Sequence, residues 1–134
     1  MGRPPVDGFS LIELLTTLAI VAILATVTVP SFTGFVARSR RSDAVAALLQ
    51  VQLAQERWRA EHLSYTADLL ALGSTSSKSP EGYYRLRAQA DAAGFFVTAE
   101  PVGVQQADSC GTFALDESGP HYAEGFADRT CWRR

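Results

Sequence analysis

The chain contains residue types that do chemistry in enzymes, but not in the arrangements that catalysis requires. Serine, histidine and aspartate occur, yet there is no Gly-x-Ser-x-Gly turn, no phosphate-binding P-loop, no His-Glu-x-x-His motif and no dinucleotide fingerprint. Glu56 and Glu61 are five residues apart, which places them on different faces of a helix. His62 and His121 are remote from each other, and no Cys-x-x-Cys is present. We therefore expect no catalytic residue, no metal and no cofactor.

A carboxylate inside an apolar block is the most unusual chemical group. Glu13 is the fifth residue of a block that begins at Phe9, and residues 14–37 contain no charged residue. At depth in a membrane a carboxylate costs about 2.5 to 3.5 kcal/mol, so such an acid usually has a partner or a task. The alternative is that Glu13 lies near the lipid headgroups. Gly8 precedes the block and supplies a small, flexible residue that could expose it to a protease.

The element that carries Glu13 must be a helix long enough to cross a membrane. The uncharged run of 24 residues would form a helix of about 36 Å, and the hydrocarbon core is about 30 Å thick. A secretory signal peptide would need a basic leader and a shorter apolar stretch, whereas the first eight residues contain only Arg3 against Asp7. We therefore predict a retained anchor.

Length and composition fit one small domain with this helix attached. The 134 residues include 12 Lys and Arg against 14 Asp and Glu, a net charge of −2, so the chain lacks the basic excess of a dedicated nucleic-acid binder. Helical periodicity continues beyond Arg41 as a stripe of apolar residues, and Asp43 is expected to lie outside this stripe. That stripe consists of Ala44, Ala47, Leu48, Val51, Ala54 and Trp58. We expect one spine from Phe9 to about Leu63, kinked at Pro30.

The remainder of the chain predicts a connecting loop and a small antiparallel sheet. Residues 64–82 are rich in Ser, Gly and Thr, which favours a loop. The segments 83–88, 95–101 and 111–116 show the alternation and the β-branched or aromatic residues of strands. A sheet of three or four strands can bury one face on the apolar stripe, which gives an α+β fold.

One predicted strand carries side chains that suit a polyanion. Alternation places Tyr83, Arg85 and Arg87 on its outward face. If the tail folds back beside this strand, the strip is extended by Lys78, Trp132, Arg133 and Arg134. The alternative, which we favour, is a solvated sheet face whose arginines pair with acids, because the net charge is near zero.

The N-terminal motif resembles a known family. Gly8-Phe9-Ser10-Leu11-Ile12-Glu13-Leu14, followed by the apolar run to Val29-Pro30, is similar to the processing and assembly signature of type IV prepilins and related pseudopilins. The resemblance implies that prepilin peptidase cuts between Gly8 and Phe9 and that the new amine of Phe9 is methylated. It also implies that Glu13 pairs with the terminal amine of a neighbouring subunit, so that Phe9, Glu13 and Pro30 serve filament assembly.

The same resemblance implies three segments and a type IV pilin fold. Residues 1–8 would be a leader peptide, residues 9–37 the membrane anchor and filament core, and residues 38–134 a periplasmic or extracellular globular domain. Arg38, Arg40 and Arg41 follow the apolar run, and the positive-inside rule would place them in the cytoplasm. The prepilin signature implies a cytoplasmic leader instead. These arginines would then pair with acidic residues or with anionic headgroups at the outer face of the inner membrane.

Cys110 and Cys131 are the only cysteines. In a periplasmic domain they should pair, closing a loop of about 22 residues and stabilising the fold by about 3 kcal/mol. The alternatives are two reduced thiols or half of a metal site. In pilins a disulfide of this kind delimits a variable C-terminal region. Residues 111–116 and the Cys131-Trp132 pair further resemble PilE-type minor pilins of Gram-negative bacteria.

The function implied by the resemblance is that of a minor pilin, a non-enzymatic structural subunit. Its partners would be other pilin subunits, prepilin peptidase and the inner-membrane assembly machinery, and its roles would be pilus biogenesis, twitching or adhesion. It would cross the inner membrane once before assembly and lie in the surface pilus afterwards. Two alternatives remain, a DNA-binding minor pilin for natural transformation and a type II secretion pseudopilin. Pseudopilins usually lack a disulfide like that of Cys110 and Cys131.

Overall fold

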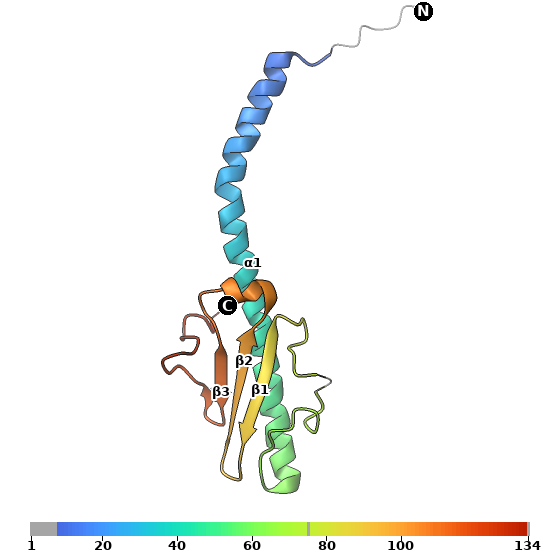
Figure 1. The fold of residues 1–134 in the computed structure, drawn as a ribbon, viewed down its shortest axis with the longest axis vertical. Coiled ribbons are helices and arrows are strands. Elements are labelled where there is room, and N and C mark those ends of the chain that lie inside the picture. The colour runs from blue at the N-terminus through green and yellow to red at the C-terminus, as the bar shows by residue number, and fades with distance from the viewer. Residues whose placement is uncertain (1–7, 75, 134) are drawn as a thin grey trace, which may run out of the picture. The chain divides into compact units, whose positions relative to one another are not determined.

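The computed structural model describes residues 8–74 and 76–133, without the side chains of residues 29–31. It contains one long helix, a short 3-10 helix and a four-stranded sheet (Figure 1). The elements in chain order are α1 (Leu11–His62), β1 (Tyr84–Ala90), β2 (Phe95–Pro101), η1 (Gly103–Ala107), β3 (Phe113–Asp116) and β4 (Gly119–Pro120). The chain divides into two compact units, with the boundary between Phe35 and Val36.

The spine that the sequence predicts over residues 9–63 is observed as α1. The helix is assigned without a break through residue 30, although proline has no backbone N–H to donate. In the first unit every described side chain of the helix is exposed, so a single chain gives these apolar residues no cover. By length and composition α1 can cross a membrane, a test that a buried core helix or a signal sequence would also pass.

All strand pairs in the sheet are antiparallel, in the order β1-β2-β3-β4. The hairpin between β1 and β2 turns between the two predicted strands, and its turn is stabilised by the Asp91 carboxylate, which accepts the backbone N–H groups of Ala93 (2.7 Å) and Gly94 (2.9 Å). The sheet has four strands, within the expected three or four, but the sequence did not locate β4, since Gly119 and Pro120 are turn-forming residues. It pairs with β3 over only two positions, a length too short to show alternation.

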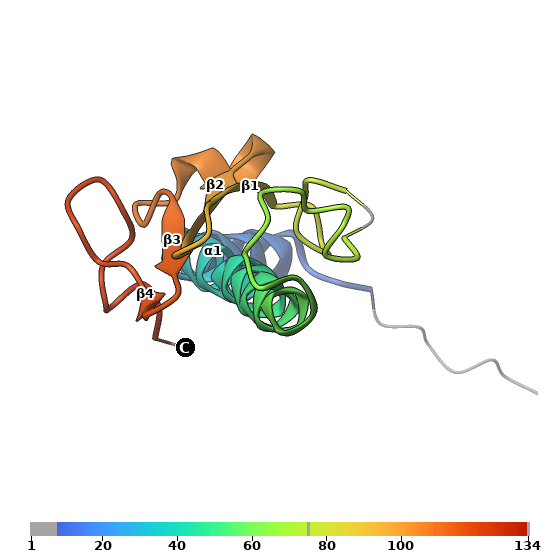
Figure 2. The same ribbon diagram turned by 90° about the horizontal axis from the view of Figure 1, so that it is seen from below.

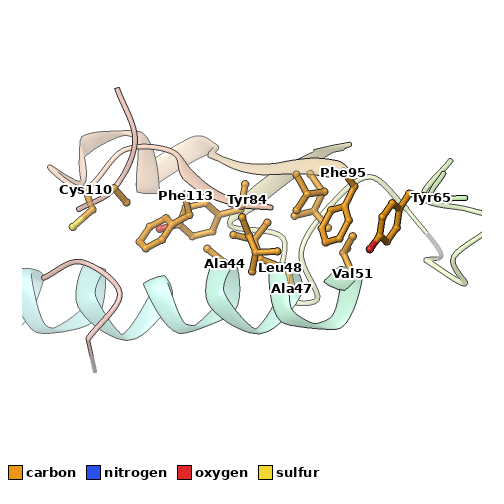
Figure 3. Packing of buried hydrophobic residues seen from close by; sticks show 14 residues of the cluster. Ala44, Ala47, Leu48, Val51, Tyr65, Tyr84, Phe95, Cys110 and Phe113 are labelled. Carbon is orange, nitrogen blue, oxygen red and sulfur yellow. The ribbon is translucent and has the colours of Figure 1, made fainter. Parts of the chain in front are cut away.

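The hydrophobic core lies between the second half of α1 and one face of the sheet. Ala44 and Leu48 on the helix lie across from Phe113 and Tyr84 on the strands, and Val51 lies across from Phe95 (Figure 3). The expected apolar stripe is therefore confirmed as far as Val51. Beyond it the stripe is only partly covered, because Ala54 and Trp58 are half-buried, and the Trp58 ring stacks on His62 with centroids 3.8 Å apart.

Candidate functional site

The predicted cleavage site is exposed. Phe9 is 80% exposed, and no atom lies within 4 Å of the position that a Cβ on Gly8 would take. The space around Gly8 would therefore admit a larger side chain, so packing among the described residues does not explain the glycine. Residues 1–7 of the predicted leader lie outside the described residues. Cleavage itself stays a prediction.

Glu13 lies in the first turn of α1, where a negative charge is favoured by the helix dipole. Its backbone carbonyl accepts the hydroxyl groups of Thr16 (3.0 Å) and Thr17 (2.7 Å), so these threonines are satisfied without lipid or water. The carboxylate is exposed and makes no ion pair with any described residue. A single chain thus leaves this charge available to a cation from elsewhere.

Of the three residues predicted to face outward, Arg85 and Arg87 do so on β1, whereas Tyr83 precedes the strand and is half-buried. The Arg87 guanidinium pairs with Glu100 on β2, with Nε and Oε1 3.1 Å apart. Arg85 is exposed and forms no ion pair among the described residues, and an isolated β-bridge brings exposed Lys78 beside it. The Tyr83 ring is half-buried beneath the guanidinium of Arg40, 4.8 Å from the ring centroid. The favoured pairing with acids therefore holds for Arg87 and not for Arg85.

The tail does not extend this strip. Trp132 is half-buried and meets the edge of the Phe113 ring on β3, with centroids 5.5 Å apart. Figure 2 shows β3 and β4 on one side of β2 and β1 on the other, so the strand that Trp132 contacts is separated from β1 by β2. Arg133 thus belongs to a different surface from Arg85, and Arg134 lies outside the described residues. The aromatic anchor and a disulfide hold the tail there.

That disulfide joins Cys110 and Cys131, whose Cα atoms are 5.8 Å apart, as expected from the resemblance. The turn before Cys131 is fixed by Asp128, whose carboxylate accepts the Thr130 hydroxyl (2.6 Å) and the N–H groups of Thr130 (2.8 Å) and Cys131 (3.0 Å). The Thr130 hydroxyl and the Cys131 N–H lower the pKa of the Asp128 carboxyl. Because the two sulfur atoms are bonded to each other, the alternatives of reduced thiols and of a metal site do not apply to these cysteines.

Sequence reasoning missed a buried carboxylate that ties the loop to the spine. Asp43 was placed off the apolar stripe, yet it is 7% exposed. It accepts the Ser79 hydroxyl and the backbone N–H groups of Glu81 (3.0 Å) and Tyr83 (3.3 Å). Each donor lies 36 to 40 residues away in the chain, so no local pattern could have revealed the contact.

A second buried polar group ties η1 to the helix. The Gln105 amide donates to the Tyr84 hydroxyl (3.0 Å), the Ala37 carbonyl (3.1 Å) and Asp108 (3.2 Å). Asp108 in turn accepts two hydrogen bonds from the Arg41 guanidinium, at 2.5 and 2.8 Å. Burial raises the pKa of Tyr84 to about 12. These groups are structural, and among the described residues no cluster of three or more His, Cys, Asp or Glu could hold a metal.

Two protein-family models match the chain. The prokaryotic N-terminal methylation motif matches residues 5–29, and the family described as "Type IV minor pilin ComP, DNA uptake sequence receptor" matches residues 30–114. Together they span the apolar segment, the spine and most of the sheet.

Individual proteins show the same similarity. The type IV major pilin PilA of Myxococcus xanthus is 35% identical over 88 residues, which are 66% of this chain and 40% of that protein. The wide-pilus major component PilA4 of Thermus thermophilus is 43% identical over 74 residues, which are 54% of this chain and 55% of that protein. The chain thus spans about half the length of the curated relatives it matches. A solved type IV pilin from Shewanella oneidensis superposes with a TM-score of 0.53 at 31% identity, covering 73% of this chain and 99% of that one.

Proposed function

Because this chain belongs to the type IV pilin family, we propose that it is a minor pilin, a structural subunit incorporated into a type IV pilus. Type IV pilins are structural proteins and not enzymes, so the expectation of a non-enzymatic protein is confirmed. The fold expected from the resemblance, a spine helix on an antiparallel sheet with a C-terminal disulfide, is confirmed as well.

The proposal assigns each segment a step in assembly. Prepilin peptidase would cut between Gly8 and Phe9, and the apolar half of α1 would hold the chain in the inner membrane with the globular domain in the periplasm. The inner-membrane machinery would then move the chain into a filament of pilin subunits. Support comes from the exposed apolar side chains of the first unit, which need lipid or other helices around them.

One observation carries the proposal: the Glu13 carboxylate lies within an exposed apolar surface and has no ion-pair partner among the described residues. Removing one charge from water into a low-dielectric filament core is costly, and an opposite charge from a neighbour offsets the cost for both partners. A neighbour's methylated Phe9 amine would supply that charge. The pair would set the axial register between subunits.

Deletion of the gene tests the proposal. We expect fewer surface pili and weaker twitching, both restored by the wild-type chain and not by Glu13→Ala, with adhesion falling alongside. Transformation should fall only as far as piliation does. Normal pili and normal twitching in the deletion strain would contradict the structural role.

A second candidate is a DNA-binding minor pilin for natural transformation. The specific support is the match to the DNA uptake sequence receptor family over residues 30–114. This range includes Lys78 and Arg85, two exposed cations that form no ion pair with any described residue. We rank it second because Arg87 is neutralised by Glu100 and the tail arginine Arg133 lies on another surface. A type II secretion pseudopilin ranks third, on account of the disulfide.

Binding of labelled duplex DNA by the full chain in detergent micelles separates the first two candidates. We expect weak binding that falls steeply with salt and lacks sequence preference. Lys78→Gln with Arg85→Gln is the informative variant, and Arg57→Gln, an exposed site on α1, is its control. Sequence-specific binding that only the first variant loses, together with normal pili and lost DNA uptake on deletion, would promote the second candidate.

A further inference from the structure

A cavity of about 200 Å³ lies between α1 and the C-terminal tail within the second unit. Its wall on the helix side runs from Arg38 to Leu49, and its other wall consists of Cys131, Trp132 and Arg133. Three lining residues are arginines and none is acidic. Neither the assembly role nor the β1 surface makes use of this site.

The charges around the cavity are not balanced. Arg41 is held by Asp108 through two hydrogen bonds, so its guanidinium is fixed in place and neutralised. Arg38 and Arg133 are exposed, and neither has a carboxylate partner among the described residues. Two unneutralised guanidinium groups therefore flank one small cavity. Guanidinium groups bind phosphate oxygens through paired hydrogen bonds, which makes a phosphate group the best-matched ligand.

Two features favour a lipid headgroup as the source of that phosphate: the apolar part of the lining and the position of the cavity along the helix. Arg38 is the first charged residue after the uncharged run of residues 14–37, and α1 continues through both without a break. Val45, Leu49 and the Trp132 indole add apolar surface to the lining. Arginine and tryptophan together are typical of the membrane interface, where anionic headgroups attract basic residues next to a membrane span.

We propose that this cavity binds the phosphate headgroup of an anionic phospholipid while the chain waits in the membrane before assembly. The inference rests on the proposed function, because it requires the apolar run to lie in a bilayer. The site would explain why Arg38 follows the membrane span on the periplasmic side, against the positive-inside rule, and it would give Arg133 a role beside it. Entry into a filament would then include release of the bound lipid.

Fluorescence of Trp132 tests the proposal directly. The chain has two tryptophans, so Trp58→Phe leaves Trp132 as the only reporter. The full chain carrying this change is placed in vesicles of phosphatidylcholine and phosphatidylglycerol, with bromine on the acyl chains of one lipid or the other. At equal mole fraction we expect brominated phosphatidylglycerol to quench Trp132 more strongly than brominated phosphatidylcholine. The double variant Arg38→Gln with Arg133→Gln should abolish that preference. Each lost arginine should lower the affinity for the anionic lipid by a factor on the order of five.

The control removes the same charge elsewhere. Arg57→Gln with Arg85→Gln takes two exposed arginines from outside the cavity and should keep the preference. If both double variants lost the preference for phosphatidylglycerol equally, the preference would come from nonspecific attraction between the positive charges and the anionic lipid. That result would overturn the proposed site. Loss of the preference on adding inorganic phosphate, but not chloride of equal ionic strength, would assign the cavity to free phosphate and would also overturn it.

The two lipids separate this inference from the function on which it rests. Equal quenching by both brominated lipids would refute the headgroup site and leave the membrane anchor intact. No quenching by either lipid would place Trp132 away from the bilayer and refute the site. If a flotation assay then showed the full chain free of the vesicles, the membrane-anchored stage of the proposed function would fail with it.

Discussion

We expect Glu13 of one subunit to be neutralised by the Phe9 amine of a neighbouring subunit, the amine that cleavage would create. Glu13→Ala should leave cleavage and membrane insertion intact, because removing the charge favours the bilayer by about 2.5 to 3.5 kcal/mol. It should reduce entry into filaments, which immunoblots of sheared pili against membranes would measure. Glu13→Asp should retain part of the function, and Leu18→Ile serves as the control within the same helix. Wild-type amounts of Glu13→Ala in pili would refute the charge pair.

Asp43 should matter for stability and not for processing. Asp43→Ala leaves the Ser79 hydroxyl and two backbone N–H groups without their acceptor, and we expect the free energy of unfolding to fall by about 2 to 3 kcal/mol. Urea unfolding of the full chain in detergent, followed by the fluorescence of the two tryptophans, would measure it. Glu61→Ala, at an exposed position of α1, should change the same quantity by less than about 0.5 kcal/mol. Equal effects of the two substitutions would contradict the tether.

Tyr84 should ionise only at strongly alkaline pH. Its pKa of about 12 lies above the ordinary value of 10.0 because burial disfavours the phenolate. A raised pKa in the folded state means that this contribution to stability is complete below pH 10 and is lost as the pH rises through 12. A tyrosinate absorbance titration should therefore show a late step that Tyr84→Phe removes. A late step that survives the substitution would assign the shift to another residue.

Among the elements, the disulfide loop should be separable from the spine. Replacing Cys110 and Cys131 with serine should destabilise residues 111–130 by about 3 kcal/mol in the chain-entropy model, with the apolar half of α1 unaffected. Amide hydrogen exchange would show the largest increase within residues 111–130, and the pilus defect should be milder than that of Glu13→Ala. Thiol alkylation of exported wild-type protein gives the check: two freely labelled cysteines would contradict the observed pairing.

The elements with a local signal could be predicted, and those that depend on distant contacts could not. The uncharged run and the apolar stripe predict α1 because helical spacing repeats along the sequence itself. Alternation likewise predicts β1 and β2. The helix η1 had no such signal, since it is held by Gln105, whose amide reaches the Ala37 carbonyl 68 residues earlier. The place of the tail depended on Trp132 finding Phe113, which the order of residues does not reveal.

For the molecule as a whole, the two units differ in whether their apolar side chains are buried. The second unit buries its own core between helix and sheet, whereas the first exposes every described side chain. A chain built this way is complete only with lipid or other subunits around its first unit. The sequence could predict that dependence, because an uncharged run and one embedded acid are visible without a structure. The sequence could not predict that Arg133 lies on a different surface from the arginines of β1.

Mass spectrometry of filaments sheared from the cell surface shows whether this chain is a processed pilin subunit. We expect to find it there with 126 residues, 134 minus the eight from Met1 to Gly8. The new N-terminal Phe9 should carry one methyl group, and the two cysteines should be joined. Absence of the chain from otherwise normal filaments, or its presence with residues 1–8 still attached, would contradict the assignment of a processed and assembled pilin subunit.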